Sequence, residues 1–215
     1  MVITFFGDFD YVETPQDRQK MMWTLTEVIG DRPAKLYFGG NGAFDEFAFN
    51  CCWEYKKINP NIKLVNVKSD IMEWCEETEL NSPTDGYDKY FFPPMLLETP
   101  RKFAASHRNF YMVEKAHIVI FYIKRENTAA YNMYEYAHYT KKITVNLAQE
   151  NMSDVISVDI ALAITRIWGN GDYSLTNLFR RFRAHKELLE DPDYKRLYDE
   201  ILEESYKNYH MNIIL

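Results

Sequence analysis

The sequence has few cysteines, and their arrangement favours neither a disulfide framework nor a metal site. The chain of 215 residues contains Cys51, Cys52 and Cys75. Their number is odd and two of them are adjacent, which is unlike the paired spacing of disulfide-rich secreted proteins. His and Cys partners at metal-ligand spacing are also missing. We therefore expect reduced thiols with a structural role, and neither a metal nor a cofactor.

Long basic segments are missing as well. The chain has 25 Lys and Arg residues against 32 Asp and Glu residues, a formal net charge of −7, and no run of five basic residues. A protein that binds mainly to phosphate backbones needs such positive charge, so we do not expect nucleic acid as a partner. The short cluster of Arg180, Arg181 and Arg183 has acidic neighbours, and we interpret it as a solvated helix face.

Membrane and export signals are the third absence. The N-terminus reads MVITFFGDFD, without a basic segment followed by an apolar stretch long enough for a signal peptide or a membrane span. We therefore expect a cytoplasmic protein with no membrane partner. Hydrophobic residues make up 47% of the chain and aromatic residues 16%, enough for a substantial core.

Short apolar runs alternate with helical patterns over the first two thirds of the chain. The expected strands are 2–6, 35–38, 62–67, 87–92, 117–123 and 141–147. The expected helices are 15–29, 44–55, 99–115 and 128–139, with a partly helical excursion between 68 and 86. This alternation predicts an α/β fold with a Rossmann-like, mostly parallel sheet and helices on both faces.

The pattern changes after Leu147. One ambiguous apolar run, VISVDIALAI, is followed by a helical pattern from Ser174 and another after Asp191-Pro192. We predict a Rossmann-like domain over 1–148 and a helical C-terminal extension over 149–215. A short helical extension seldom stabilises itself, so the C-terminal helices are candidates for homo-oligomer contacts.

A glycine-rich turn, GGNG, follows the second expected strand and precedes a helix. It lacks the Lys-Ser/Thr pair of a P-loop and the third glycine of a dinucleotide fingerprint. Its glycines still allow backbone N–H groups to approach an anion at a helix N-terminus. The alternative is a bend that only needs positive φ. In parallel sheets ligands bind beyond the carboxyl ends of the strands, which is where this turn is expected.

Four segments together resemble one known family. They are YFGGNGAFDEFA, YDKYFFPPMLLETPRKFAASHRNFYM, HIVIFYI and TAAYNMYEYAHYTKKITVNL. Taken in order, they resemble the SLOG superfamily of Rossmann-like nucleotide-binding proteins, which includes LOG phosphoribohydrolases and DprA-like proteins, and most closely its small YpsA-like branch. The resemblance covers roughly residues 1–148 and implies a nucleotide-type ligand at the glycine turn and at Phe44-Asp45.

The resemblance also implies candidate catalytic residues. Arg108 falls at the position of the arginine in the LOG Arg-Lys-x-x-Met segment, and Glu135 falls at that of the LOG catalytic carboxylate. Cleavage of an N-glycosidic bond needs such a carboxylate and a cation. The glycines of the second LOG motif are replaced by Thr128 and Ala129. Related small proteins often carry a cation where this chain has Asp8, so we expect Asp8 to face a ribose hydroxyl rather than a phosphate.

These observations predict a binding protein, a sensor or a sequestering protein, for a nucleotide-derived small molecule. One alternative is a phosphoribohydrolase-like hydrolase of nucleoside monophosphates, and another is a scaffold that acts through its helical tail. Structural readings stay open for the individual residues: Asp45 as a helix cap, Arg108 as the partner of a core-edge carboxylate, and Glu135 as an exposed helix residue. The predicted ligand residues are Gly7, Asp8, Gly39, Gly40, Asn41, Gly42, Phe44, Asp45, Arg108, Asn109, Thr128 and Ala129.

Overall fold

The computed structural model describes residues 1–40, 42–71, 85–150, 155–168 and 186–209. Contacts within the chain divide it into two units, Met1–Val155 and Ile156–Leu215. The expected helix from Ser174, the basic cluster 180–183, Cys75 and most of the excursion between 68 and 86 lie outside the described residues.

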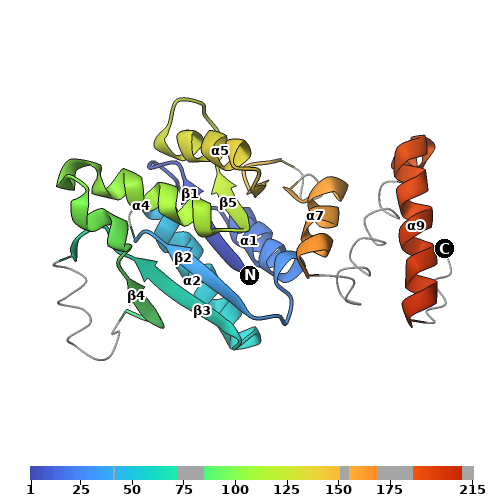
Figure 1. Ribbon diagram of the computed structural model, residues 1–215, viewed down its shortest axis with the longest axis horizontal. Coiled ribbons are helices and arrows are strands. Elements are labelled where there is room, and N and C mark those ends of the chain that lie inside the picture. Colours follow the sequence, from blue (N-terminus) through green and yellow to red (C-terminus); the bar gives the residue numbers. More distant parts are fainter. Residues whose placement is uncertain (41, 72–84, 151–154, 169–185, 210–215) are drawn as a thin grey trace. The chain divides into compact units, whose positions relative to one another are not determined.

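The first unit contains a sheet of six strands, all parallel (Figure 1). The strand order is β4-β3-β2-β1-β5-β6, and every neighbouring pair runs in the same direction. The α/β Rossmann-like prediction is confirmed. The strands are β1 (Val2–Gly7), β2 (Ala34–Phe38), β3 (Ile62–Val67), β4 (Lys89–Phe91), β5 (Ile118–Tyr122) and β6 (Ile143–Asn146).

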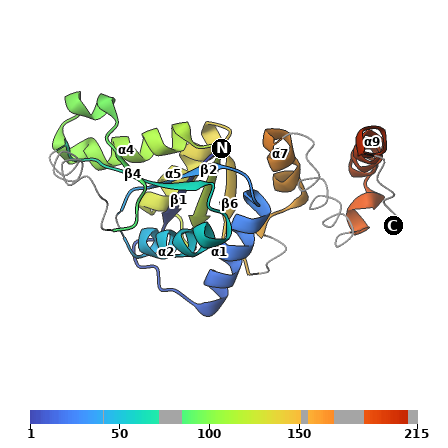
Figure 2. The ribbon, with the colours of Figure 1, turned by 90° about the horizontal axis from the view of Figure 1, so that it is seen from below.

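Helices cover both faces of this sheet, which is the arrangement that right-handed crossovers give when the strand order reverses at β1. One face carries α1 (Pro15–Val28) and α2 (Ala43–Ile58), and the other carries α4 (Arg101–Lys115) and α5 (Ala129–Tyr139) (Figure 2). The chain moves outward from β1 through β2, β3 and β4, and then returns to the other side of β1 as β5. The direction of winding therefore reverses between β1 and β5, which places a crevice beyond their carboxyl ends.

Local chemistry explains where the helices begin. Thr14 caps α1 in a capping box with Asp17, and Pro15 occupies the first helical position. The segment before α4 differs from the prediction, because a short 3-10 helix, η1 (Pro94–Glu98), precedes it. Pro100 is the N-cap of α4, so the helix begins at Arg101, two residues later than the expected start at residue 99.

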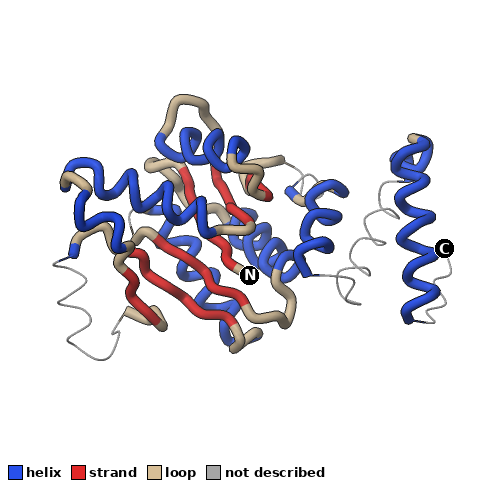
Figure 3. The backbone as a smooth tube through the Cα atoms, in the orientation of Figure 1, coloured by secondary structure: helices blue, strands red, loops and turns tan. Residues whose placement is uncertain are grey.

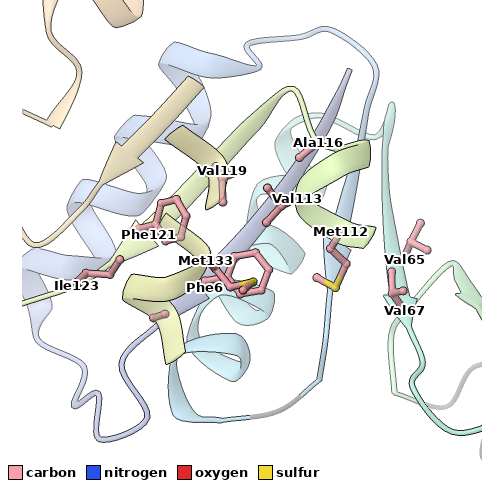
Figure 4. Packing of buried hydrophobic residues seen from close by; sticks show 12 residues of the cluster. Phe6, Val65, Val67, Met112, Val113, Ala116, Val119, Phe121, Ile123 and Met133 are labelled. Carbon is pink, nitrogen blue, oxygen red and sulfur yellow. The ribbon is translucent and has the colours of Figure 1, made fainter. Parts of the chain in front are cut away.

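An apolar cluster between the sheet and the helices α4 and α5 forms one side of the core (Figure 4). Phe6 of β1 and Phe121 of β5 stack within it, with ring centroids 6.0 Å apart. Met112 of α4 and Met133 of α5 belong to the same cluster, and Met133 lies beside Phe6 (Figure 4). Each fully buried side chain of this size contributes on the order of 1.5–3 kcal/mol to the free energy of unfolding. The cluster holds α5 and the C-terminal part of α4 against β1, β3 and β5.

The second unit is helical in its described parts (Figure 3). It contains α7 (Val158–Trp168), the 3-10 helix η2 (Lys186–Glu190) and α9 (Pro192–Tyr209). The ambiguous run VISVDIALAI therefore leads into a helix rather than a strand. Across the described segments of both units, no helix combines the length and the apolar character needed to cross a membrane.

Cys51 and Cys52 are free thiols buried on the inner face of α2. Burial raises the pKa of Cys51 to about 12, and it raises the pKa of Cys52 well above its usual range. Because the thiolate is the reactive form, both side chains are chemically inert at neutral pH. Their role in this fold is packing.

A buried asparagine ties the loop after α1 to the turn before β3. The Asn59 amide nitrogen donates to the Gly30 carbonyl at 3.0 Å and to the Arg32 carbonyl at 2.9 Å, and its oxygen accepts from the Asn61 N–H at 3.0 Å. Asn59→Ala should lower the free energy of unfolding by about 2 kcal/mol, because the Arg32 carbonyl and the Asn61 N–H lose a part-buried partner, while the Gly30 carbonyl keeps only the Tyr55 hydroxyl at 2.7 Å. Urea denaturation followed by circular dichroism measures this loss.

The neighbouring Asn61 is a matched control. Its side chain makes one exposed hydrogen bond, to the Asp31 carbonyl at 3.3 Å. Asn61→Ala should change the free energy of unfolding by less than about 0.5 kcal/mol. Equal losses for Asn59→Ala and Asn61→Ala would contradict the role of the buried amide.

Candidate functional site

A cavity of about 590 Å³ lies beyond the carboxyl ends of β1, β2 and β5. This is the crevice at the reversal between β1 and β5, and its size is typical of a small-molecule site. The walls come from the loop after β1, the turn between β2 and α2, the N-terminal half of α4, and the loop that enters α5. The lining residues are Phe6, Gly7, Asp8, Phe9, Asp10, Gly39, Gly42, Phe44, Asp45, Ala105, Arg108, Asn109, Arg125, Thr128, Ala129 and Ala130.

All of the predicted ligand residues line this cavity except Gly40 and Asn41. Gly40 faces Asn66, whose amide nitrogen lies 3.3 Å from the point where a Cβ on Gly40 would stand. Asn41 lies outside the described residues. The tertiary structure thus brings together segments that are far apart in the sequence, while ligand binding by these residues stays a prediction.

The floor of the cavity is aromatic and depends on Gly7. A Cβ on Gly7 would stand 2.3 Å from Cγ of Phe44, a distance that no real contact reaches. The Phe44 ring packs edge-on against Tyr11, with centroids 5.2 Å apart, and lies 5.8 Å from the ring of Tyr122. The absence of a side chain on Gly7 therefore allows the Phe44 ring of α2 to pack closely against the end of β1. That packing role was not part of its sequence-based interpretation.

Asp8 links the end of β1 to the loop after β5. Its side chain is only 5% exposed. Its N–H donates to the Tyr122 carbonyl at 3.1 Å, and Oδ2 accepts from the Lys124 N–H at 3.1 Å. Within the described part of the chain, no donor lies within hydrogen-bond distance of the buried Oδ1. Such an oxygen costs on the order of 1–3 kcal/mol unless a donor from outside the described residues satisfies it.

Arg108 lies beneath the glycine turn with its side chain 4% exposed. Nη1 donates to the Gly39 carbonyl at 2.7 Å, and Nε and Nη2 donate to Oδ1 of Asn109 at 3.2 and 3.0 Å. A Cβ on Gly39 would stand 2.8 Å from Nη2 of Arg108 and 3.3 Å from Oδ2 of Asp45. Glycine at position 39 thus lets a guanidinium and a carboxylate both lie against the turn.

The turn itself has the backbone of a tight bend. Gly40 has φ of +73° and Gly42 has φ of +103°, both in the region that favours glycine. Gly42 is the N-cap of α2 and has no side chain to offer to the first N–H groups of that helix. A Cβ on Gly42 would meet nothing within 4 Å, so this part of the turn is open. A tight bend and an anion-binding turn are therefore compatible interpretations of the same residues.

The start of α5 forms the opposite wall. Thr128 caps the helix, and its hydroxyl accepts from the Tyr131 N–H at 3.1 Å. Ala129 and Ala130 line the cavity, and their N–H groups have no partner inside the helix. Glu135 is exposed and is not among the lining residues. It lies seven positions after Thr128, roughly 10 Å farther along the helix axis.

Six of the lining residues are not among the predicted ligand residues: Phe6, Phe9, Asp10, Ala105, Arg125 and Ala130. Asp10 and Arg125 form an ion pair at 2.6 Å that joins the loop after β1 to the loop after β5. Both lie within four residues of the end of an expected strand, which is the one local signal that marks them. Their pairing spans 115 positions in the sequence, and no local pattern reports it.

The charges around the cavity are mixed. Carboxylates come from Asp8, Asp10 and Asp45, and guanidinium groups come from Arg108 and Arg125. Such a lining suits a ligand that has an anionic group at one end and hydrogen-bond donors at the other. Among the residues that the structure describes, no cluster of His, Cys, Asp and Glu side chains is placed to hold a metal ion.

Comparison of the chain with protein-family models gives no match, and comparison with curated proteins gives none either. The chemistry of the cavity is therefore inferred from its own residues and geometry.

The contact between Gly7 and Phe44 makes a specific prediction. Gly7→Ala places a methyl group against Cβ and Cγ of Phe44, which are not free to move, because the ring is fixed by Tyr11 and Tyr122. The free energy of unfolding should fall by about 3 kcal/mol, as for an overpacked core. Urea denaturation measures the loss.

Gly42→Ala is the comparison variant, because its added methyl group meets open space and the only cost is the positive φ. This variant should lose about 1 to 3 kcal/mol, because φ of +103° with ψ of 160° is a backbone region that is nearly restricted to glycine. A loss of less than about 1 kcal/mol for Gly7→Ala would show that the Phe44 ring is not held against the end of β1.

Proposed function

We propose that the protein binds a nucleotide-derived small molecule in this cavity and acts as a sensor or a sequestering protein. The observation that carries the proposal is the position and lining of the cavity. It lies at the reversal point of a parallel sheet, and it is bounded by a glycine turn, a buried arginine and the starts of two helices. Ligands of Rossmann-like sheets bind at this place.

The anionic part of such a ligand has donors on two sides. The first turns of α2 and α5 both border the cavity, and each contributes backbone N–H groups at the positive end of a helix. Arg108 adds a fixed positive charge beneath the turn at Gly39. A phosphate group of a nucleotide is the common ligand that matches this set.

The sugar part of the ligand is expected at the end of β1. A carboxylate such as that of Asp8 accepts hydrogen bonds and donates none, and one oxygen of Asp8 lacks a donor among the described residues. A carboxylate repels a phosphate and accepts hydrogen bonds from hydroxyl groups. This side of the cavity therefore favours a ribose.

The resemblance to the SLOG superfamily supports the same proposal, since it places a nucleotide at the glycine turn. The chain departs from the LOG enzymes where α5 begins, because Thr128 and Ala129 replace glycines. Side chains at these positions keep the backbone farther from a phosphate than glycines would. This departure favours binding over hydrolysis.

A blocked cavity tests the proposal. Ala105 is an exposed residue of α4 that lines the cavity, and Ser106 beside it is exposed but does not. Thermal unfolding is measured with AMP, ADP-ribose and cyclic di-AMP at saturating concentration. At one hundred times the Kd, a ligand should stabilise the wild type by about 2.7 kcal/mol. Ala105→Trp should abolish this stabilisation, and Ser106→Trp should retain it.

Two results would count against the proposal. The first is that no compound in the panel stabilises the wild type. The second is that Ala105→Trp and Ser106→Trp respond to a bound compound equally, because the ligand would then occupy another part of the molecule.

The second candidate function is hydrolysis of an N-glycosidic bond. One observation favours it, which is that Asp45 and Arg108 both approach Gly39 within the cavity. A carboxylate and a cation at one place are the groups that this reaction uses. Asp45 is a better placed carboxylate than Glu135, which is exposed and outside the lining.

The two carboxylates can be separated by activity. Release of free base from AMP is followed by chromatography. If the protein is a hydrolase, Asp45→Asn should lower the rate by at least about a hundredfold, and Glu135→Gln should leave it unchanged. The reverse result would assign the reaction to Glu135, and no base release by the wild type would remove this function.

A further inference from the structure

The most exposed large apolar side chain described in the first unit belongs to the cavity. Phe9 is the second residue after the end of β1, lines the cavity, and is 91% exposed. Its neighbours in the chain show the opposite behaviour, because Phe5 and Phe6 of β1 are buried and stacked on Phe38 and Phe121. Within the described residues, Phe9 has no aromatic partner.

The backbone presents Phe9 in a fixed position. The Tyr11 N–H donates to the Asp8 carbonyl at 3.1 Å, which closes a four-residue turn with Phe9 and Asp10 at its tip. Asp8 is held by the Lys124 N–H, and Asp10 pairs with Arg125 at 2.6 Å. The tip is thus anchored on both sides to the loop after β5.

The turn itself does not need an aromatic residue at this position. Small and polar residues form such turns without exposing apolar surface, and burial of the Phe9 ring contributes nothing to the fold. A ring that is held at the rim of a cavity and uncovered by the protein is a surface for another flat group. Aromatic side chains bind nucleobases in this way, through faces that stack.

We propose that Phe9 is a stacking platform for a planar aromatic group of the ligand, the nucleobase of a nucleotide. This assignment rests on the proposed function, which it deepens by giving each part of the ligand a place. The base lies on Phe9 at the rim, the ribose lies toward Asp8, and the phosphate lies toward the starts of α2 and α5. Asp10, next to Phe9, offers a carboxylate to an amino group on the edge of the base.

Val12 is a matched control in the same loop. It is also apolar and 78% exposed, but it does not line the cavity. Neither Phe9 nor Val12 contributes a buried side chain, so substitution of either by alanine should leave the fold intact. Phe9→Tyr keeps a ring of the same shape and serves as the conservative variant.

The test compares a ligand that has a base with one that lacks it. Binding of AMP and of ribose 5-phosphate is measured by isothermal titration calorimetry. Phe9→Ala should weaken AMP binding by about tenfold or more and leave ribose 5-phosphate binding unchanged. Phe9→Tyr and Val12→Ala should keep the affinity for AMP within about twofold of the wild type.

Three results would overturn the inference. In the first, Phe9→Ala binds AMP as tightly as Val12→Ala does. In the second, Phe9→Ala loses affinity for AMP and for ribose 5-phosphate by the same factor, because the side chain would then act on the cavity as a whole. In the third, the wild type binds neither compound. The ADP-ribose and cyclic di-AMP measurements, with the Ala105→Trp variant, decide the proposed function separately, since only AMP is shared by the two tests.

Discussion

The contact on which the site depends is the one between the buried guanidinium of Arg108 and the carbonyl of Gly39. A charged group that is almost completely buried is costly unless hydrogen bonds compensate it. Here the turn carbonyl and the amide of Asn109 satisfy it, and glycine at position 39 provides the space. The contact joins α4 to the turn between β2 and α2, so it fixes the two walls of the cavity relative to each other.

The rest of the cavity is positioned by the sheet and by aromatic packing. Parallel strands end at a common edge, and the reversal between β1 and β5 leaves that edge uncovered by a crossover. Phe44 fills the space beneath it against Gly7 and Tyr122. The apolar cluster around Phe6, Phe121 and Met133 holds the start of α5 on the opposite side. The polar groups of the site thus stand on a rigid apolar base, which is the usual condition for a preformed ligand site.

Most of the elements could be predicted from local patterns, because strand and helix periodicities are properties of neighbouring residues. The strand 62–67 is one example, since a run rich in β-branched residues is typical of a strand. The helix after Thr128 is another, since Thr128 is a residue type that caps helices. The predicted start of α4 was less accurate. Pro93 and Pro94 begin a short 3-10 helix, and Pro100 then caps α4, so the α-helix starts only at Arg101. The run after Leu147 was ambiguous because an apolar segment of that length suits a strand or a helix equally.

The candidate site, like the fold, has features that could be predicted from the sequence and features that could not. By itself the sequence determined that a glycine turn, an aspartate and a helix beginning near Thr128 follow strands of a parallel sheet, and topology then brings such residues to one edge. Only the tertiary structure decided which of them share a cavity, that Gly7 makes room for an aromatic ring, and that Glu135 lies outside the lining. It also decided the pairing of Asp10 with Arg125 and the exposure of Phe9. The physical reason is that these features depend on distances between segments as far as 115 positions apart, and local periodicity carries no information about such distances.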